Sequence, residues 1–440
     1  MLTPGPMAAA PTTLPAGVPP KLARIGAGLI LLLGALTAIG PFTIDLYLAA
    51  FPQITADMST SPAAVQLTIT ATLAGLAIGQ LLIGSISDAV GRRKPLLVGL
   101  GLYVLASIGI TFVTSVEALT ALRFVEGLGA SAGMVLSMAI VRDRFEGIQV
   151  GKALARLMLV VGVAPSIAPL IGAQFLHFGS WRYMFVALAL FGVLLLVLAF
   201  FLLKESLPAQ LRRSGGITSA ARSYGSLLRD PMFMGLALLS GFSMAALFTY
   251  VSSATFVFQE GFGLSAQQFA VIFASGAVAI TAGTQINGAM IGRVAPEQIL
   301  RGGVLASLAI TGSMVAVTLL GFGLWPLIVL LVANMLVTGV LLPAVPMIAL
   351  DANPHRAGST AALLGAFQFG VGALIAPVTG LFPEGSAVAM ASVMFGASLV
   401  TVVITLAIRP AMRRTTAAAR VLARSDELTA RELVVEERVG

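Results

Sequence analysis

Long apolar segments recur along the chain, and short polar connections separate them. A helix needs about 20 mostly apolar residues to cross the roughly 30 Å of hydrocarbon in a bilayer. Several of these segments lack the sustained apolar–polar alternation of a strand, and they are too long for strands. The sequence therefore predicts an all-α integral membrane protein. Its twelve predicted transmembrane helices cover approximately residues 25–50, 63–87, 95–115, 118–141, 152–176, 181–203, 231–256, 267–291, 301–320, 324–347, 359–380 and 387–408.

The polar connections divide these spans into two groups of six. Residues 21–203 form an N-terminal six-helix bundle, residues 204–230 a linker, and residues 231–408 a C-terminal six-helix bundle. Two similar halves joined by a polar linker are typical of a duplicated transporter, whose site lies near the midplane between the halves. A Pro/Ala/Thr-rich arm, residues 1–20, is expected to be disordered. Residues 409–440 form a cytoplasmic tail, in which Thr415–Gly440 alternates arginine with acidic residues and either forms a surface helix or stays solvated.

Composition excludes a water-soluble globule. Apolar residues make up 58% of the chain and charged residues 10%, with a mean hydropathy of +0.99, whereas soluble domains carry about 25% charged residues. The absence of cysteine excludes a disulfide scaffold and thiol catalysis. His177 and His355 lie far apart, so we expect no metal site. The chain also lacks the usual hydrolase, metalloprotease and nucleotide-binding motifs, and we expect no enzyme and no cofactor.

The basic residues indicate the orientation of the chain. With a cytoplasmic N-terminus, all of the 26 lysines and arginines except Arg123 and Arg182 fall in inner connections or in the C-terminal tail. This distribution follows the positive-inside rule. It predicts a multi-pass protein of the inner (plasma) membrane with both termini in the cytoplasm. Because the positive charge is spread over loops, we expect no nucleic-acid partner.

Three ionisable residues lie inside the predicted spans: Asp45, Arg123 and Glu126. Such groups are costly in hydrocarbon and by default mark a transport pathway or a proton relay. Arg123 and Glu126 are three residues apart and share one helix face. Glu126 is either a second proton carrier or the salt partner of Arg123, and we favour the partner. Asp45 is either a proton-coupling group or a helix-end carboxylate that faces outer water.

The connection between the second and third spans holds a compact motif that includes Gly84, Asp88, Gly91, Arg92 and Arg93. The two glycines permit close helix contact and a tight turn. Asp88 can pair with the cations that follow it, or with the positive start of a neighbouring helix. Span eleven, which begins with Gly358-Ser359-Thr360 as an expected N-cap, is the candidate. The alternative is a basic loop that only orients the helices.

The pattern Gly84-x-x-x-Asp88-x-x-Gly91-Arg92-Arg93-Lys94, at this place in a twelve-span chain, resembles the signature loop of the major facilitator superfamily. Further segments are similar to the drug/proton antiporters of the bicyclomycin and chloramphenicol/florfenicol resistance (Bcr/CflA) branch, and the resemblance covers about residues 25–408. These segments are Asp45-Leu-Tyr47-Leu-Ala-Ala-Phe51-Pro52, Arg123-Phe-Val-Glu126-Gly127, Val141-Arg142-Asp143, Ala164-Pro165-Ser-Ile-Ala168-Pro169, Trp181-Arg182 and Ala246-Leu-Phe248-Thr-Tyr250-Val-Ser252-Ser253.

The resemblance implies a proton-driven efflux pump that works by alternating access. Asp45 and Arg123 align with the acidic span-one and basic span-four positions of the branch, whereas Glu126 departs from it because glutamine is usual there. Asp143 joins the cytoplasmic gate motif. We expect protonation of Asp45 to compete with substrate, so that the proton gradient drives transport and no other cofactor is needed.

Span five contains Pro165 and Pro169, which break backbone hydrogen bonds and favour a kink, and Gly162 and Gly172, which allow close packing. In antiporters of this superfamily a similar element is held to seal the pathway against leak. Kinked helices are also common in membranes for structural reasons.

Substrate contacts follow only from residue type. A promiscuous cavity favours aromatic surface with few polar anchors, and each candidate fits lipid or interhelix packing equally well. The candidates are Phe42, Tyr47, Phe248, Tyr250 and Gln368. The expected substrate is an amphenicol, a bicyclomycin-like compound or a lipophilic drug, carried by a monomer in lipid. The alternatives are a proton-coupled or passive transporter of a small metabolite, and a non-transporting sensor or scaffold.

Overall fold

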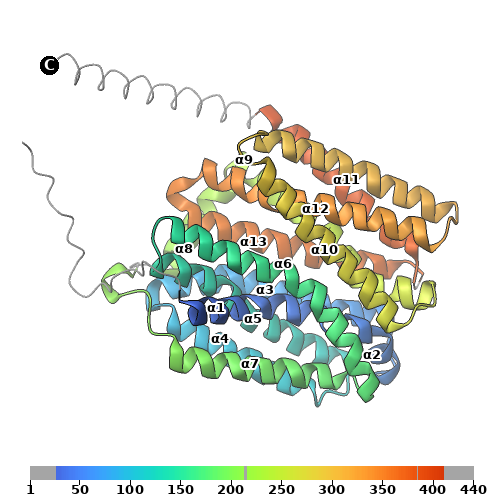
Figure 1. Ribbon diagram of the computed structural model, residues 1–440, viewed down its shortest axis with the longest axis horizontal. Helices are drawn as coiled ribbons and strands as arrows, with labels where there is room; N and C mark the ends of the chain where they lie inside the picture. The colour runs from blue at the N-terminus through green and yellow to red at the C-terminus, as the bar shows by residue number, and fades with distance from the viewer. Residues whose placement is uncertain (1–25, 213–215, 384, 411–440) are drawn as a thin grey trace, which may run out of the picture.

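The computed structural model describes residues 26–212, 216–383 and 385–410. Within these ranges it holds twelve helices that are long and apolar enough to cross a membrane, which confirms the predicted fold class (Figure 1). The first six spans are built from α1 (Ala27–Asp45), α3 (Pro62–Val90), α4 (Arg93–Ile110), α5 (Val116–Arg144), α6 (Ile148–Phe175) and α7 (Arg182–Leu202). The second six are α9 (Pro231–Thr255), α10 (Ala266–Met290), α11 (Pro296–Leu319), α12 (Leu324–Ala352), α13 (Ala357–Ile375) and the final helix, Ala387–Pro410.

Small residues bring helices of the same half into close contact. In the N-terminal half, a Cβ on Gly127 of α5 would overlap the carbonyl of Thr72 on α3. In the C-terminal half, a Cβ on Gly339 of α12 would overlap the carbonyl of Ile280 on α10. Lipid gives helices no hydrophobic reason to associate, so close backbone contact of this kind supplies the packing energy. In each half, a glycine of the fourth span therefore lets the backbone of the second span approach closely.

Two helix pairs form the boundary between the halves: α3 lies against α13, and α6 against α10. We call the end that carries Asp88 the inner end and the opposite end the outer end, after the predicted orientation. At the outer end, side chains join the halves. Thr255 Oγ1 donates to the carbonyl of Leu48 at 3.0 Å, and Gln259 Nε2 donates to that of Ala49 at 3.1 Å. Thr379 Oγ1 donates to Gln66 Oε1 at 3.1 Å. The outer end is therefore closed.

The helices at this closure are irregular. After α1 the chain continues through a 3₁₀ turn, η1 (Leu48–Ala50), and a short helix, α2 (Phe51–Asp57). α9 continues as a π-helix, η4 (Phe256–Gly261), and α13 as a 3₁₀ segment, η6 (Ala376–Leu381). The first and seventh spans therefore extend beyond the predicted limits at residues 50 and 256. Polar side chains and the other half satisfy the backbone groups that these irregular turns expose.

The linker contains a helix that the sequence did not predict, α8 (Gly216–Leu228), preceded by a 3₁₀ turn, η3 (Ala209–Leu211). It lies at the inner end, opposite α2 (Figure 1). Tyr224 Oη donates to the carbonyl of Leu81 on α3 at 3.2 Å, while Arg356, before α13, donates to Ser226 Oγ at 2.7 Å. α8 therefore contacts both halves.

The expected N-cap of span eleven at Ser359 is wrong. A 3₁₀ turn, η5 (Pro354–Arg356), runs directly into α13, so the helix begins at Ala357. Arg356 occupies the N-cap position, and its side chain makes no hydrogen bond to the first turn of the helix. The predictions for the arm, residues 1–20, and for the tail after residue 410 lie outside the described residues.

Candidate functional site

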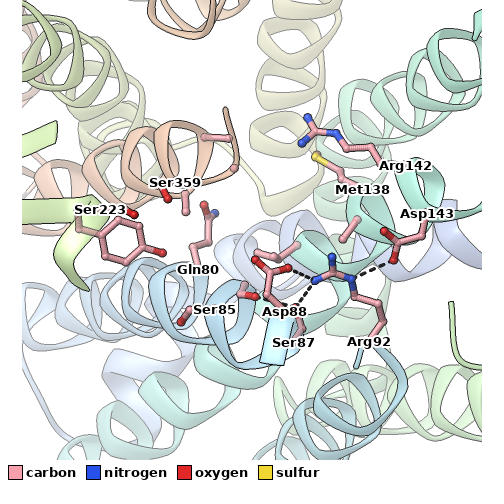
Figure 2. A pocket seen from close by; sticks show the side chains of 17 residues that line it. Gln80, Ser85, Ser87, Asp88, Arg92, Met138, Arg142, Asp143, Ser223 and Ser359 are labelled. Carbon is pink, nitrogen blue, oxygen red and sulfur yellow. Dashed lines mark hydrogen bonds and ion pairs between the residues drawn. The ribbon is translucent and has the colours of Figure 1, made fainter. Parts of the chain in front are cut away.

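A cavity of about 390 Å³ opens between the halves at the inner end (Figure 2). α3 and α5 form its wall on the N-terminal side, and α8 and α13 form the wall on the other. The predicted gate residues Gly84, Asp88, Arg92 and Asp143 all line it. The sequence motif therefore stands at the mouth of a cavity that is open at the inner end.

Arg92 holds the motif together. Its guanidinium pairs with Asp88 through Nη1, donates to Ser87 Oγ at 2.7 Å, and donates from Nε to Asp143 Oδ2 at 3.0 Å (Figure 2). Ser206, which follows α7, also donates to Asp143, at 2.9 Å. Burial alone would lower the pKa of Arg92, but the carboxylates of Asp143 and Asp88 outweigh it and raise that pKa. The arginine therefore stays charged and links α3, α5 and the segment after α7.

Glu205 is a second anchor, which the sequence analysis missed. Its carboxylate accepts the backbone N–H groups of Arg92 at 2.8 Å and Arg93 at 3.2 Å, and those of Ser206 and Leu207 at 3.0 Å. Burial raises the pKa of Glu205, but these four donors outweigh it and lower that pKa. Gly91, at φ 99°, has no space for a side chain because a Cβ would overlap the Glu205 carboxylate.

Two contacts that the sequence made possible for Asp88 are absent among the described residues: an ion pair with Arg93 and a contact with the start of span eleven. Arg93 Nη2 donates to the carbonyl of Phe200 on α7 at 2.7 Å, and its guanidinium lies 5.2 Å from the centre of the Phe200 ring. Asp88 does not pair with the start of α13 among the described residues: Ser359 lies across the cavity from it (Figure 2). That predicted pairing is wrong for this conformation, because the open inner cavity separates the two.

A second cluster lies inside the N-terminal half. Arg123 is fully buried and pairs through Nη1 with Glu126, which is also fully buried. Arg123 Nη2 donates to the carbonyl of Thr43 on α1 at 2.8 Å, and the guanidinium stacks 4.2 Å from the ring centre of Tyr47. Ser107 Oγ donates to Glu126 at 2.7 Å. Of the two alternatives for Glu126, the geometry is that of the salt partner.

Asp45 stands apart from this cluster. Asp45 is only 5% exposed, so its carboxyl group is enclosed by the protein and does not face outer water. Arg123 reaches the carbonyl of Thr43, two residues earlier, and the described residues place no cation or hydrogen-bond donor on Asp45. Tyr250, on α9 of the other half, has a hydroxyl group without a hydrogen-bond partner among the described residues. Tyr250 is 2% exposed and stacks on Phe273, with ring centres 5.2 Å apart.

The other candidate substrate contacts divide between the halves. Phe42 packs on Phe191 of α7 with ring centres 5.8 Å apart, and Tyr47 Oη hydrogen-bonds Thr68 at 2.8 Å. In the C-terminal half, Phe248 packs against Phe369 at 5.7 Å, and Gln368 Nε2 donates to Ser240 Oγ at 2.9 Å. None of the five predicted substrate contacts lines the cavity at the inner end, so for this cavity the prediction is wrong.

The Pro/Gly helix α6 contacts both the Asp45 region and the opposite half. A Cβ on Gly172 would overlap the carbonyl of Leu46, directly after Asp45. At Gly162 the contact is with α10, where Thr281 Oγ1 donates to the Gly162 carbonyl at 3.0 Å. Pro165 and Pro169 lie between these contacts, inside a continuous helix.

Comparisons with known proteins agree with this geometry. The profile of the Major Facilitator Superfamily matches residues 31–377. The uncharacterized MFS-type transporter YdgK of Bacillus subtilis (strain 168) is 40% identical over 369 residues, which cover 83% of this chain and 92% of that protein. A bicyclomycin resistance protein homolog of Haemophilus influenzae is 32% identical over 347 residues, covering 79% and 87%.

Among solved structures, a D-xylose-proton symporter superposes with a TM-score of 0.69 over 85% of this chain and 96% of its own, at 14% identity. At that identity the likeness concerns the fold alone. The sequence relatives are transporters and not enzymes. The chain therefore belongs to the Major Facilitator Superfamily, to its Bcr/CflA-type drug/proton antiporter branch, and is a multi-pass membrane transporter.

Proposed function

We propose that this transporter exports small amphipathic compounds from the cytoplasm in exchange for protons. It acts across the inner membrane with both termini in the cytoplasm. Support comes from the relative named for bicyclomycin resistance and from the distribution of basic residues. The expected substrate is an amphenicol, a bicyclomycin-like compound or a lipophilic drug. On this proposal, the conformation with joined outer ends and a cavity at the inner end is the one that takes up substrate from the cytoplasm.

The observation that carries the proposal is the isolation of Asp45. Arg123 is already neutralised by Glu126 within its own half, so Asp45 is left without a cation among the described residues. An ionised carboxylate in apolar surroundings is costly unless something compensates its charge. A proton can do so, and so can a polar or cationic group of a substrate. Both need the same oxygen atoms, so proton and substrate exclude one another.

The test compares the wild type with Asp45→Asn in a host without its own drug pumps. The amide keeps the size of the side chain but cannot exchange a proton. Asp351→Asn is the matched control, because Asp351 is an exposed aspartate at the end of α12. We expect the wild type and the control to raise the inhibitory concentration of at least one of the three compound classes, and Asp45→Asn to lose that protection.

Everted membrane vesicles then test the coupling. Addition of a substrate should release protons that the vesicles have stored, and Asp45→Asn should abolish this release. Substrate movement with no proton release would favour the passive metabolite transporter. A wild type that protects against none of the three compound classes would contradict the drug-efflux proposal.

A further inference from the structure

One contact across the outer closure involves a histidine. The side chain of Gln267, on α10, reaches the imidazole of His177, in the 3₁₀ turn η2 (Leu176–Phe178) that follows α6, with 2.9 Å between the two Nε2 atoms. Closer to the middle of the same two helices, Thr281 donates to the carbonyl of Gly162. The contact between Gln267 and His177 therefore closes the outer end of the boundary between α6 and α10.

This contact assigns a protonation state to the imidazole. An amide nitrogen donates hydrogen bonds and cannot accept them, so the Nε2 atom of His177 must be the acceptor. The imidazole is therefore neutral and carries its proton on Nδ1. The same amide nitrogen of Gln267 also donates to the carbonyl of Ala173 on α6, at 3.4 Å, and this carbonyl fixes which end of the amide faces the ring.

A proton on the imidazole would break the contact. Both ring nitrogens are donors in the protonated form, so the new N–H group at Nε2 would confront the NH₂ group of Gln267. Turning the amide round would offer its oxygen to the ring but would set that oxygen against the carbonyl of Ala173. Neither orientation of the amide then satisfies both neighbours, whereas the neutral imidazole leaves both satisfied.

The turn that carries the histidine is held in place from α2. The side-chain nitrogen of Gln53 donates to the carbonyl of Gly179, and its oxygen accepts the backbone N–H of Trp181 at 3.0 Å. α2 directly follows η1, whose carbonyls accept the hydrogen bonds from the C-terminal half at the outer end. The histidine turn and the other contacts of the outer closure therefore rest on the same part of the N-terminal half.

The hydrogen bonds described above for the outer closure differ from this one in their response to pH. They use hydroxyl and amide side chains, those of Thr255, Gln259, Thr379 and Gln66, which keep the same charge at every working pH. Histidine changes its charge between about pH 5 and 8. The contact at His177 therefore gives the outer closure a pH-sensitive member.

The charged groups on the neighbouring elements do not oppose a proton on the imidazole. α6, on which η2 packs, carries its cations Lys152 and Arg156 near the inner end, and α10 contains no charged residue. Arg182, at the start of α7, is paired with Asp57 of α2 at 2.6 Å. Glu260, in η4 before α10, is an acid, and a negative charge favours a protonated imidazole.

We propose that His177 and Gln267 form a pH-sensitive clasp: the neutral imidazole helps to keep the outer end closed, and a proton taken up from outside releases it. The clasp stabilises the closed outer end at a pH above the range in which histidine titrates, about pH 5 to 8. This stabilisation is lost as the external pH falls through that range.

The clasp goes beyond the proton exchange proposed at Asp45. The imidazole is exposed at the outer surface, so its proton comes from the outside and returns there without crossing the membrane. An acidic exterior weakens the closure of the outer end and thereby favours the outward-open state. For a proton-driven exporter, that is the state which takes up protons and releases substrate.

Thiol labelling from outside tests the clasp. The chain contains no cysteine, so Ser252→Cys introduces a single thiol. Ser252 is 0% exposed and lies one turn before Thr255, on the face of α9 that meets the other half. A membrane-impermeant maleimide therefore reaches this thiol from outside when the outer end opens. The labelling rate is measured in right-side-out vesicles with a fixed internal pH.

Each rate is divided by that of the same protein with His177→Gln. The glutamine keeps an acceptor near the position of the imidazole Nε2 but cannot be protonated. The ratio therefore cancels the pH dependence of the thiol itself and that of Asp45. We expect a ratio of about one at an external pH of about 8. At an external pH of about 5 it should be about two to ten, the effect of losing one hydrogen bond between neutral groups.

Two further variants separate the clasp from a merely structural contact. His355→Gln, at the exposed histidine of η5 at the inner end, is the matched control and should leave the labelling rate unchanged at every external pH. Gln267→Glu should reverse the sign, because a carboxylate accepts a hydrogen bond from the protonated imidazole. Its ratio to the Gln267→Glu/His177→Gln double variant should fall below one at low pH. A ratio of one throughout for the unmodified pair, or the same rise in Gln267→Glu, would overturn the clasp.

Spin labels give a second measurement that does not need the buried thiol to react. Glu117→Cys, at the start of α5, and Phe322→Cys, before α12, place labels at exposed outer positions of the two halves. In detergent, the population with a long distance between the labels should grow more on acidification than it does with His177→Gln. An equal response in both proteins would refute the clasp. Neither measurement needs a substrate, so a protein that exports no drug would end the efflux proposal and leave the clasp standing.

Discussion

Replacing Glu205 by glutamine tests whether the inner motif is held by the segment that follows α7. The carboxylate accepts four backbone N–H groups, two on Arg92 and Arg93 and two on Ser206 and Leu207. A glutamine of the same size keeps one acceptor oxygen. Its other terminal atom becomes an NH₂ group that confronts N–H donors. Three of the four N–H groups, those of Arg92, Ser206 and Leu207, bond to Oε1, and that of Arg93 bonds to Oε2. With its oxygen at the first position, glutamine loses the bond from Arg93 and the negative charge that strengthens the other three, while the shape of the side chain is unchanged.

The magnitude follows from the strength of such bonds. A hydrogen bond to a charged group contributes about 1.5–3 kcal/mol and one to a neutral group about 0.5–1.5 kcal/mol. Losing one charged bond and making three others neutral would therefore cost more than about 3 kcal/mol if the site were dry. Glu205 is only partly buried, and water can replace part of what is lost. We therefore expect a loss of about 2–3 kcal/mol. For a unit the size of one half of this chain, that corresponds to a melting temperature lower by about 4–12 °C.

The pH dependence has a definite sign. The pKa of Glu205 is lowered in the folded protein, so its carboxylate stabilises the fold fully above the unfolded value of about 4.3. That stabilisation is lost as the pH falls through the lowered folded pKa. The difference between wild type and Glu205→Gln should therefore be constant from about pH 6 to 8 and should shrink below the unfolded pKa.

Thermal unfolding of the purified protein in detergent measures both effects. Glu117→Gln, at an exposed glutamate in the first turn of α5, is the control and should change the melting temperature little. An unchanged melting temperature for Glu205→Gln at pH 7 would show that the four N–H groups find water equally well. A difference that persists undiminished at low pH would show that the charge of Glu205 is not what stabilises the loop.

Two further variants test the packing and the buried ion pair. Gly172→Ala places a Cβ against the carbonyl of Leu46 and should lower the free energy of unfolding by about 1–3 kcal/mol. The control Gly101→Ala, whose Cβ meets nothing within 4 Å, should stabilise α4 or leave it unchanged. Equal melting temperatures for the two variants would refute the close contact at Gly172. Glu126→Leu leaves the buried charge of Arg123 uncompensated and should lower the free energy of unfolding by about 3–5 kcal/mol. The double variant Arg123→Leu/Glu126→Leu should recover much of that loss. A double variant whose loss of stability equals the sum of the losses of Arg123→Leu and Glu126→Leu would contradict the pairing.

Hydrophobic patterning was sufficient to predict the spans, because a lipid solvent leaves few alternatives to a helix of about 20 apolar residues. It could not predict α8. That segment is too short to be a span, and its apolar residues Ile217, Ala221, Tyr224 and Leu228 follow the spacing of an amphipathic helix instead of forming the long apolar run that marks a span. Its helix depends on contacts such as that of Tyr224 with the carbonyl of Leu81, which exist only once the bundle has formed.

In the candidate site, too, some features could be predicted from the sequence and others depend on the folded structure. Burial of Asp45, Arg123 and Glu126 could be expected from the cost of charge in a membrane, and the spacing of Arg123 and Glu126 indicated their pairing. Which oxygen of α1 accepts a hydrogen bond from Arg123 depends on where that helix ends. α1 ends at Asp45, so the carbonyl of Thr43 lies in its last turn, where helix carbonyls lack an intrahelical donor, and Arg123 donates to it. Glu205 was missed because its four partners are backbone N–H groups, which leave no trace in side-chain patterns.

The isolation of Asp45 also bears on how the membrane voltage enters the cycle. On the proposed mechanism, one titrating carboxyl group exchanges one proton for each substrate molecule. If the cargo is uncharged, every turnover carries one positive charge inward, and each 100 mV of potential adds about 2.3 kcal/mol of driving force. If the cargo is a monovalent cation, the charges cancel and only the pH difference drives export. Collapsing the voltage alone would then slow the export of neutral compounds and spare that of cations.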